Sequence, residues 1–350
     1  MPRRQTFPSV HAVDNTVPVP PKLWKQVSQR LTFLQHPFGT VPIYLVSPDT
    51  IDRLSSPDHW ELDPECLRRV FADLRDRVRQ AVQKKEDVDI GRFIDGLLKE
   101  CQRRRPVLLG CYVADASTVG FGGSGAVHTV EQAAEAALKV RLSFPRGPAI
   151  FLCPDRIFSY PNGHLVFQIV LIHELVHAYQ GTTFWARGAY SKTWGRVIEE
   201  SLANAVTFWH FQAQERPAVA AFMTSQPAEY AAYVYWLGLT GDGRDRRAET
   251  RLLKEVLMAW REGPSETWPL LWTEWYWWWR RHPFWFEWFE AVGPLAIYGG
   301  TPLEWVAMRE LGRILNPGEM RDLIDRRQDR VIEDGLALLA VRILAEVIPG

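Results

Sequence analysis

The sequence contains little cysteine, and no two cysteines form a C-x-x-C pair. The four cysteines are Cys66, Cys101, Cys111 and Cys153. They are too few and too widely spaced for the dense disulfide framework of a small secreted domain. We therefore expect buried free thiols and a cytoplasmic protein.

The chain also lacks a long hydrophobic run and an excess of charge of one sign. No segment reaches the length of a membrane span without charged residues, and residues 1–8 have a basic flank but no apolar run behind it. We therefore expect neither membrane insertion nor a secretory signal. Lysine plus arginine (41) balance aspartate plus glutamate (41), so no overall field attracts nucleic acid or an anionic bilayer.

The most glycine-rich segment lacks the residues of a phosphate-binding loop. Residues 120–125 have the sequence GFGGSG, without the lysine and hydroxyl residue of a P-loop and without the spacing of a dinucleotide turn. We interpret this segment as a flexible loop. No nucleotide site is predicted from it.

The pattern of apolar residues predicts an α+β fold, since it changes from mixed α/β to almost wholly helical near residue 163. A chain of 350 residues can bury a core large enough for an enzyme with a cleft. The expected strands are 41–46, 106–113 and 148–153. The expected helices are 24–34, 63–83, 90–104, 130–142, 163–180, 192–213, 217–224, 227–238, 247–261, 302–314 and 317–347 with a break. The expected parts are an extended lead-in (1–40), a mixed α/β part (41–162), a helical part (163–262) and a tryptophan-rich and helical region (263–350).

An H-E-x-x-H motif lies in the expected helix 163–180. It consists of His173, Glu174 and His177. Histidines at positions i and i+4 of a helix share one face, so both imidazoles can reach a single cation. Zinc suits them best because it accepts nitrogen ligands without redox chemistry, and three protein ligands leave a fourth position for water. The apolar residues around the motif indicate a buried helix rather than a surface helix.

Glu174 lies between the two histidines in sequence and projects to the side of the metal. From there its carboxylate can take a proton from zinc-bound water as the water attacks a carbonyl, and pass it to the leaving amine. The competing interpretation is a pair of core histidines beside an incidental glutamate. We favour the zinc site because three buried titratable groups without a cation would each need a partner.

A third ligand is expected on the following helix, where Glu199 and Glu200 are adjacent. Here the sequence resembles the gluzincin metallopeptidases, such as the thermolysin-like enzymes, in which H-E-x-x-H is followed by a metal-binding glutamate on the next helix. The resemblance covers about residues 148–210 and implies Glu200 as the ligand, with Glu199 as the competing one. It also places Asn204 where those enzymes have an aspartate that orients a zinc-bound histidine. The residues around Glu200 depart from the thermolysin pattern, because Glu199 replaces an asparagine and Ala203-Asn204 replace serine-aspartate.

The resemblance implies a zincin-like core, in which a small sheet packs on the motif helix, and a zinc-dependent hydrolase. The expected reaction is peptide-bond cleavage by a zinc-bound water that Glu174 activates. Strand 148–153 would then be the sheet edge beside the cleft, able to hold an extended peptide as an added strand. A buried strand without ligand contact is the alternative for this segment.

The residue that stabilises the oxyanion of a scissile carbonyl is not singled out by spacing. His210 lies ten residues beyond Glu200, off the ligand face, and is expected to be a core or surface histidine. The candidates are Arg187, Tyr190, His210, Tyr230, Tyr233 and Tyr235.

A second function class comes from the tryptophan-rich tract 264–300. More than half of the 16 tryptophans lie in residues 260–288, where aromatic packing, a substrate wall or a partner-binding surface are all open interpretations. The alternative to an enzyme is a catalytically silent zincin-fold protein that binds a protein partner through this half of the chain. The basic run Arg103-Arg104-Arg105 is expected to be a solvated helix end.

Overall fold

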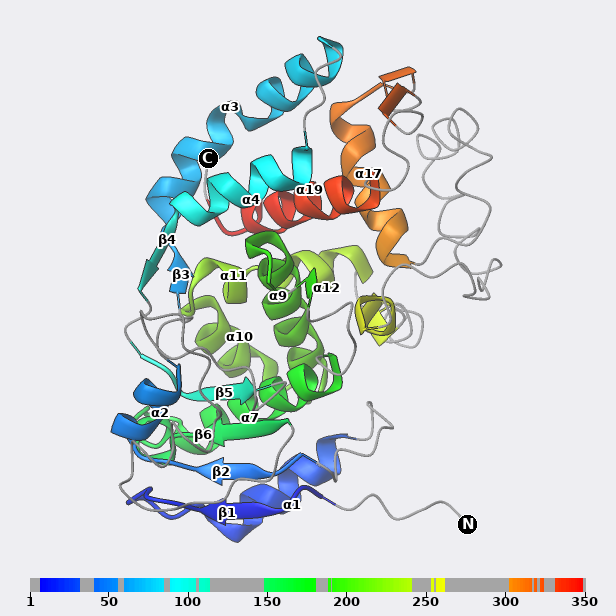
Figure 1. Cartoon of the computed structure of the whole chain (residues 1–350). Coiled ribbons are helices and arrows are strands. Elements are labelled where there is room, and N and C mark those ends of the chain that lie inside the picture. Colours follow the sequence, from blue (N-terminus) through cyan, green and yellow to red (C-terminus); the bar gives the residue numbers. More distant parts are fainter. Residues whose placement is uncertain are drawn as a thin grey trace. The chain divides into compact units, whose positions relative to one another are not determined.

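The computed structural model has mixed α/β architecture, with mostly helical content and a small sheet, as the sequence predicts (Figure 1). The structure describes residues 7–31, 41–55, 60–84, 89–104, 107–113, 148–180, 188–189, 191–240, 253–254, 256–261, 302–316, 318–319, 322–323 and 331–348. The glycine-rich loop 120–125, the expected helix 130–142 and the tryptophan-rich tract 264–300 lie outside these residues. In the part of the chain that is described, no helix has the length and apolar character needed to cross a membrane.

The chain forms two compact units, and each combines segments that are distant in sequence. Unit 1 consists of Met1–Glu61, Arg103–Thr182 and Ala203–Pro227. Unit 2 consists of Leu62–Gln102, Thr183–Leu202 and Ala228–Gly350. Helix α9 (Thr193–Trp209) is one continuous helix that contributes residues to both units. The units therefore do not follow the linear division expected from the sequence.

Unit 1 is built on a four-stranded sheet with the strand order β1-β2-β6-β5. Strands β1, β2 and β6 are parallel, while β5 runs antiparallel to β6 and pairs Gly110 with Leu152. The bounds are β1 Val10–Ala12, β2 Ile43–Leu45, β5 Gly110–Val113 and β6 Ala149–Leu152.

The expectation that strand 148–153 forms the sheet edge is wrong. β6 lies between β2 and β5, and its four residues are all buried. A strand that is covered on both sides has the continuous apolar sequence AIFL, because no position of it faces water. Within the described residues, β5 and β1 are the end strands of this sheet.

Helix α7 (Gly163–Gln180) packs against β5 and β6 and confirms the predicted helix 163–180. It also contacts α1 (Pro21–Arg30), α6 (Pro154–Ile157) and α10 (Arg216–Thr224). Because neighbours surround α7, its sequence is apolar on nearly every face. Helix α2 (Pro48–Ser55) completes the described helices that lie wholly in unit 1.

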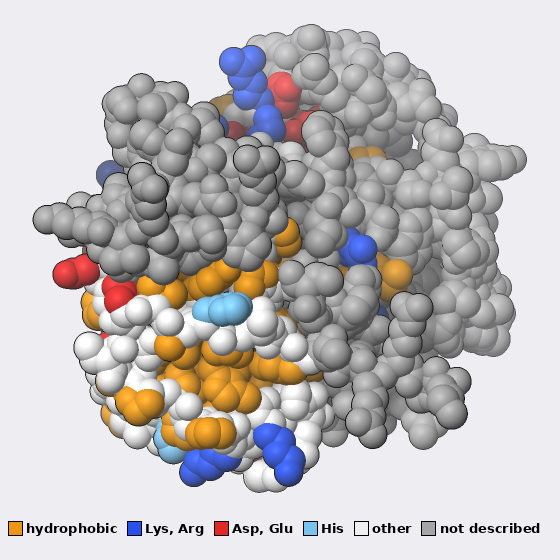
Figure 2. All heavy atoms as spheres, turned by 60° about the horizontal axis from the view of Figure 1, so that its bottom comes forward, with side chains coloured by type: hydrophobic (Ala, Val, Ile, Leu, Met, Phe, Trp, Pro, Cys, Tyr) orange, Lys and Arg blue, Asp and Glu red, His pale blue; other side chains and the backbone are white. Residues whose placement is uncertain are grey.

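At the opposite end of the sheet from β5, the three residues of β1 are exposed, and Val10 retains 38% of its accessible surface. Figure 2 views the side of Figure 1 on which β1 and α1 lie, where hydrophobic side chains gather and a few lysine or arginine side chains lie at the margin.

Unit 2 is mainly helical. Helix α19 packs against α17, α4 and α11, and α3 packs against α4 and α17. A Cβ atom at Gly335 of α19 would lie 2.8 Å from the carbonyl oxygen of Ala307 in α17, so glycine permits this close helix packing. The bounds are α3 Pro64–Gln83, α4 Ile90–Glu100, α11 Ala228–Ala231, α12 Val234–Thr240, α17 Pro302–Ile314 and α19 Val331–Ala345.

The basic run after α4 does not form a helix end. Arg103 and Arg104 belong to β4 (Gln102–Arg104), which pairs with β3 (Trp60–Leu62) in a two-stranded sheet. The Nε atom of Arg103 lies 2.7 Å from Glu61 Oε1. The predicted helix 90–104 therefore ends four residues early, at Glu100.

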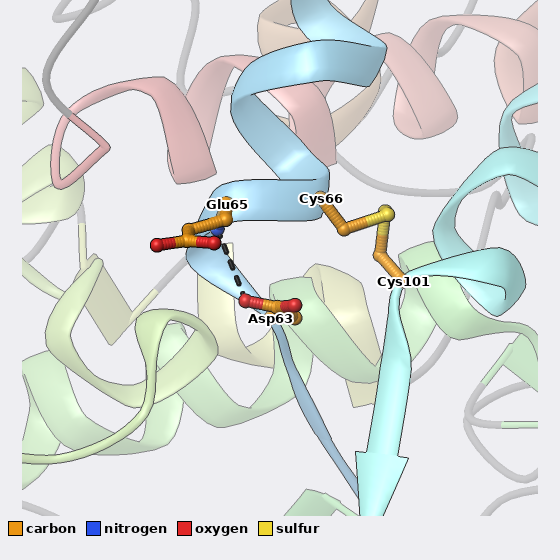
Figure 3. The surroundings of a disulfide bond; sticks show 4 residues. All are labelled: Asp63, Glu65, Cys66 and Cys101. Carbon is orange, nitrogen blue, oxygen red and sulfur yellow. Dashed lines mark hydrogen bonds between the residues drawn. A yellow bond between two sulfur atoms is a disulfide. The ribbon is translucent and has the colours of Figure 1, made fainter.

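Two of the four cysteines form a disulfide, contrary to the expected free thiols. Cys66 in the first turn of α3 is bonded to Cys101, which caps α4 (Figure 3). Asp63 orients the start of α3, since its carboxylate accepts a hydrogen bond from the Glu65 amide at 3.1 Å. Cys111 and Cys153 are free, and burial raises the pKa of the Cys153 thiol, which keeps it protonated.

Candidate metal site

Helix α7 supplies three of the predicted site residues from its buried interior. His173, Glu174 and His177 are 7%, 6% and 5% exposed. The apolar residues between and around them are buried in the core, and this packing fixes the helix on which the two imidazoles stand. The packing around α7 therefore also restricts the positions of the His173 and His177 side chains.

The two imidazoles converge through the same ring atom. His173 Nε2 and His177 Nε2 are 2.9 Å apart, and the rings are nearly perpendicular at 82°. A cation held at about 2.0–2.1 Å by two nitrogens in tetrahedral geometry needs them roughly 3.3 Å apart. The two Nε2 atoms would need to move only slightly further apart to bind the same cation.

Glu200 of α9 completes a group of three ligand atoms. One atom each from His173, His177 and Glu200 lie within 4.8 Å of one another, and all three residues are buried. Two imidazole nitrogens and one carboxylate oxygen form a donor set that zinc accepts at a catalytic site. This buried group could hold a metal ion.

The neighbouring Glu199 has a different environment. Its Oε2 atom accepts a hydrogen bond of 3.1 Å from the indole nitrogen of Trp260, which is fully buried. Successive residues on a helix are about 100° apart, so Glu199 and Glu200 cannot face the same group. Of the two glutamates, Glu200 is the one that the structure brings to the histidines.

Arg196, which the sequence analysis did not single out, lies one turn before Glu200. Its Nε atom is 3.6 Å from Glu200 Oε1, and both side chains are only 4% exposed. A buried cation beside a buried carboxylate offsets part of the cost of removing that charge from water. The i, i+4 spacing on the predicted helix was the signal that could have identified this pair.

The carboxylate of Glu174 lies against the backbone of β5. A Cβ atom added to Gly110 would be 2.9 Å from Glu174 Oε1 and 2.7 Å from Val170 Cγ1. Real side chains do not tolerate contacts of this length without a shift, so the missing side chain at position 110 provides the space that Glu174 occupies. Glu174 is therefore held between α7 and an end strand of the described sheet.

Asn204 lies on α9 one turn beyond Glu200 and is 4% exposed. The assignment of Asn204 to orienting a histidine stays a prediction.

Two of the predicted oxyanion donors make hydrogen bonds elsewhere. The Tyr235 hydroxyl donates to Glu310 Oε1 at 3.3 Å, and burial raises the pKa of this tyrosine. His210 is 8% exposed, and its Nδ1 bonds to the Val206 carbonyl oxygen at 2.8 Å, which makes it a core histidine. Tyr230 and Tyr233 are buried in unit 2, and Arg187 and Tyr190 lie outside the described residues.

Comparison with known proteins does not extend this assignment: no protein-family model, curated protein or solved structure matches the chain.

Proposed function

We propose that this protein is a zinc-dependent hydrolase that cleaves peptide bonds, with a gluzincin-like site and a zincin-like core. The observation that carries the proposal is the buried group of His173, His177 and Glu200, whose ligand atoms lie within 4.8 Å of one another. Glu174 is buried on the same helix as the two histidines and directly follows His173. A carboxylate next to three protein ligands is the arrangement that metal-assisted hydrolysis requires.

The residues of the site would have different roles in this reaction. A bound zinc ion would supply a Lewis acid that polarises the scissile carbonyl and lowers the pKa of water. His173, His177 and Glu200 would hold the ion, and Arg196 would hold the carboxylate of Glu200. Glu174 would accept a proton from the attacking water as the carbon–oxygen bond forms, and donate it to the leaving nitrogen as the carbon–nitrogen bond breaks.

A peptide substrate is supported by the position of β5. This strand ends the described sheet, contacts α7 and is only partly buried at residues 110–112. An extended peptide can add to such a strand through main-chain hydrogen bonds. The contact of Gly110 with Glu174 would bring that peptide next to the general base. We therefore propose that β5, and not strand 148–153, binds the extended peptide at the sheet edge.

A structural metal site is the second candidate function. The three ligand residues are only 3–7% exposed, and such low exposure is also typical of a metal that stabilises the fold. In that case the protein would act by binding a partner, and the tract 264–300 remains the predicted surface.

The first experiment compares metal content and hydrolysis in four proteins. Wild type is expected to bind about one zinc ion per chain and to cleave members of a peptide library, with cleavage lost in the presence of a chelator. Glu174→Gln is expected to retain zinc and lose roughly 100-fold to 10,000-fold of the hydrolysis rate. Glu200→Gln is expected to lose zinc, whereas the matched variant Glu199→Gln is expected to keep both zinc and activity.

The results of this experiment distinguish the peptidase from the structural metal site. Zinc binding by wild type without cleavage of any library member supports the structural metal site. A metal-free wild-type protein, whose stability does not change when His173 or His177 is replaced by alanine, would refute both functions.

A further inference from the structure

The last residue of α7, Gln180, combines complete burial with an unsatisfied side chain. Its exposed fraction is 0%. Among the described residues, none offers a hydrogen-bond partner to either Oε1 or Nε2 of its amide. Buried amides in folded proteins are nearly always bonded, because an unmade hydrogen bond costs the desolvation of the group. The lack of a hydrogen bond at both Oε1 and Nε2 of Gln180 therefore requires an explanation.

The helix register places Gln180 in line with the metal-binding histidines. It follows His177 by three residues and His173 by seven, and these spacings return to the same face of an α-helix. Glu174, by contrast, is rotated by about 100° from His173. Position 180 thus lies on the ligand face of α7, about one turn beyond the second histidine.

A second buried glutamine on α7, Gln168, has a side-chain amide that is hydrogen-bonded within the protein. Gln168 is 6% exposed, and both ends of its side chain are bonded. Its Oε1 accepts from Arg30 Nε at 2.8 Å, and its Nε2 donates to the His164 carbonyl oxygen at 3.3 Å. Gln168 precedes His173 by five residues and lies on a different face. The unsatisfied glutamine is the one on the ligand face.

We propose that Gln180 is a substrate-binding residue whose amide hydrogen-bonds a peptide group near the scissile bond. A primary amide offers one acceptor and two donors without charge, and this matches the N–H and C=O of a peptide group. Gln180 is roughly 4.5 Å beyond His177 along the helix axis, the advance of one to two residues of extended peptide. This inference rests on the proposed peptidase function and adds a residue that contacts the substrate.

The test uses Gln180→Met, which keeps the length of the side chain and removes the amide. Binding of two probes is measured with zinc-loaded protein: acetohydroxamate, which reaches only the metal, and a succinyl hydroxamate extended by a dipeptide. We expect equal zinc content and equal acetohydroxamate affinity in wild type and variant. The affinity for the dipeptide hydroxamate is expected to fall about tenfold in the variant, as for the loss of one to two hydrogen bonds.

Thermal unfolding without ligand separates substrate binding from a structural role. Gln180→Met is expected to keep or raise Tm, because it removes an amide that is not bonded in the folded protein. The matched variant Gln168→Met is expected to lower Tm by several degrees, because it removes two hydrogen bonds and leaves Arg30 with one partner fewer.

Two results would overturn the inference while leaving the peptidase proposal intact. One is equal affinity of wild type and Gln180→Met for the dipeptide hydroxamate. The other is a Tm loss in Gln180→Met as large as that in Gln168→Met, which would show that the amide is bonded within the folded protein. A zinc-loaded wild type that binds neither hydroxamate overturns both the proposed function and the role of Gln180.

Discussion

Glu199 and Glu200 are chemically identical neighbours, and only their surroundings decide which of them can serve a metal. The sequence identifies the pair, and the resemblance to gluzincins favours Glu200. Glu199 accepts a hydrogen bond from Trp260, 61 residues further along the chain. No local pattern predicts such a contact, because it depends on how distant helices pack. The two histidines of the H-E-x-x-H motif needed no such information, since their spacing on one helix already brings them together.

Gly110 is the residue whose role is least visible in the sequence, and it leads to a prediction. In Gly110→Ala the added Cβ would lie 2.7 Å from Val170 Cγ1 and 2.9 Å from Glu174 Oε1, so we expect the Glu174 carboxylate to be displaced along with the side chain of Val170. We expect a stability loss of about 1–3 kcal/mol from overpacking. If Glu174 is the general base of the proposed reaction, we also expect a fall in kcat of at least tenfold with unchanged zinc content, because a small displacement of a general base is costly.

Gly96→Ala is the control for this substitution. Gly96 lies within α4, and a Cβ atom there would meet nothing within 4 Å. Alanine is the better helix former by about 1 kcal/mol, so this variant is expected to be slightly more stable and equally active. Full activity in Gly110→Ala, measured alongside this control, would contradict a role for Gly110 in positioning Glu174.

At the scale of elements, the sequence predicts the helices that are apolar all round or clearly amphipathic, and it fails on sheet order. The bounds of α7 match the predicted helix 163–180. The error on strand 148–153 has a physical origin, because a hydrophobic run is equally typical of a strand covered by a helix and of one flanked by other strands. β6 pairs with β5, which lies near residue 110, and a pairing across that separation is not encoded in local periodicity.

Helix α9 carries an element-scale prediction through the pair Arg196 and Glu200. Arg196→Met would remove a buried cation from beside the buried Glu200 carboxylate. Removing one partner of a buried pair costs about 3–5 kcal/mol. Zinc bound as proposed would supply positive charge to the same carboxylate, so we expect a clearly smaller loss in the zinc-loaded protein. Thermal unfolding with saturating zinc and with a chelator measures both values.

Arg342→Met is the matched control on another helix. Arg342 also forms an i, i+4 pair, with Glu346, but these side chains are 40% and 34% exposed. Exposed pairs of this kind contribute roughly 0–1 kcal/mol, and no dependence on zinc is expected. If Arg196→Met lost the same stability with and without zinc, Arg196 would not act through Glu200 as a metal ligand, contrary to the proposal.

At the scale of the whole molecule, the sequence predicts the mixed α/β class but not how the chain divides. Composition changes near residue 163, yet both units combine segments from before and after that point. A boundary can be found in sequence when a linker marks it, and here α9 continues through the division between Leu202 and Ala203 without interruption. The division depends on tertiary contacts, which hydrophobic patterning does not specify.

The Cys66–Cys101 disulfide corrects an expectation that was based on the density of cysteines. A few scattered cysteines do not suggest a framework, but a single bridge needs only two that the fold brings together, and here the two Cα atoms are 5.3 Å apart. Disulfides persist in oxidising compartments and are rare in the cytosol. The cytoplasmic location therefore stays a prediction, and this bond is an observation against it.

The bond carries a prediction for the stability of the whole chain. It closes a loop with a sequence separation of 35, and the entropy that such a cross-link removes from the unfolded chain corresponds to about 3–4 kcal/mol. A reductant is therefore expected to lower the Tm of wild type by roughly 5 °C. The double variant Cys66→Ser/Cys101→Ser should unfold at that lower temperature with or without reductant. Thiol titration of the unfolded proteins provides the count, since wild type should show only Cys111 and Cys153 before reduction. Four reactive thiols in untreated wild type, together with a Tm that does not change with reductant, would mean that the disulfide does not form. The observation against a cytoplasmic location would then no longer hold.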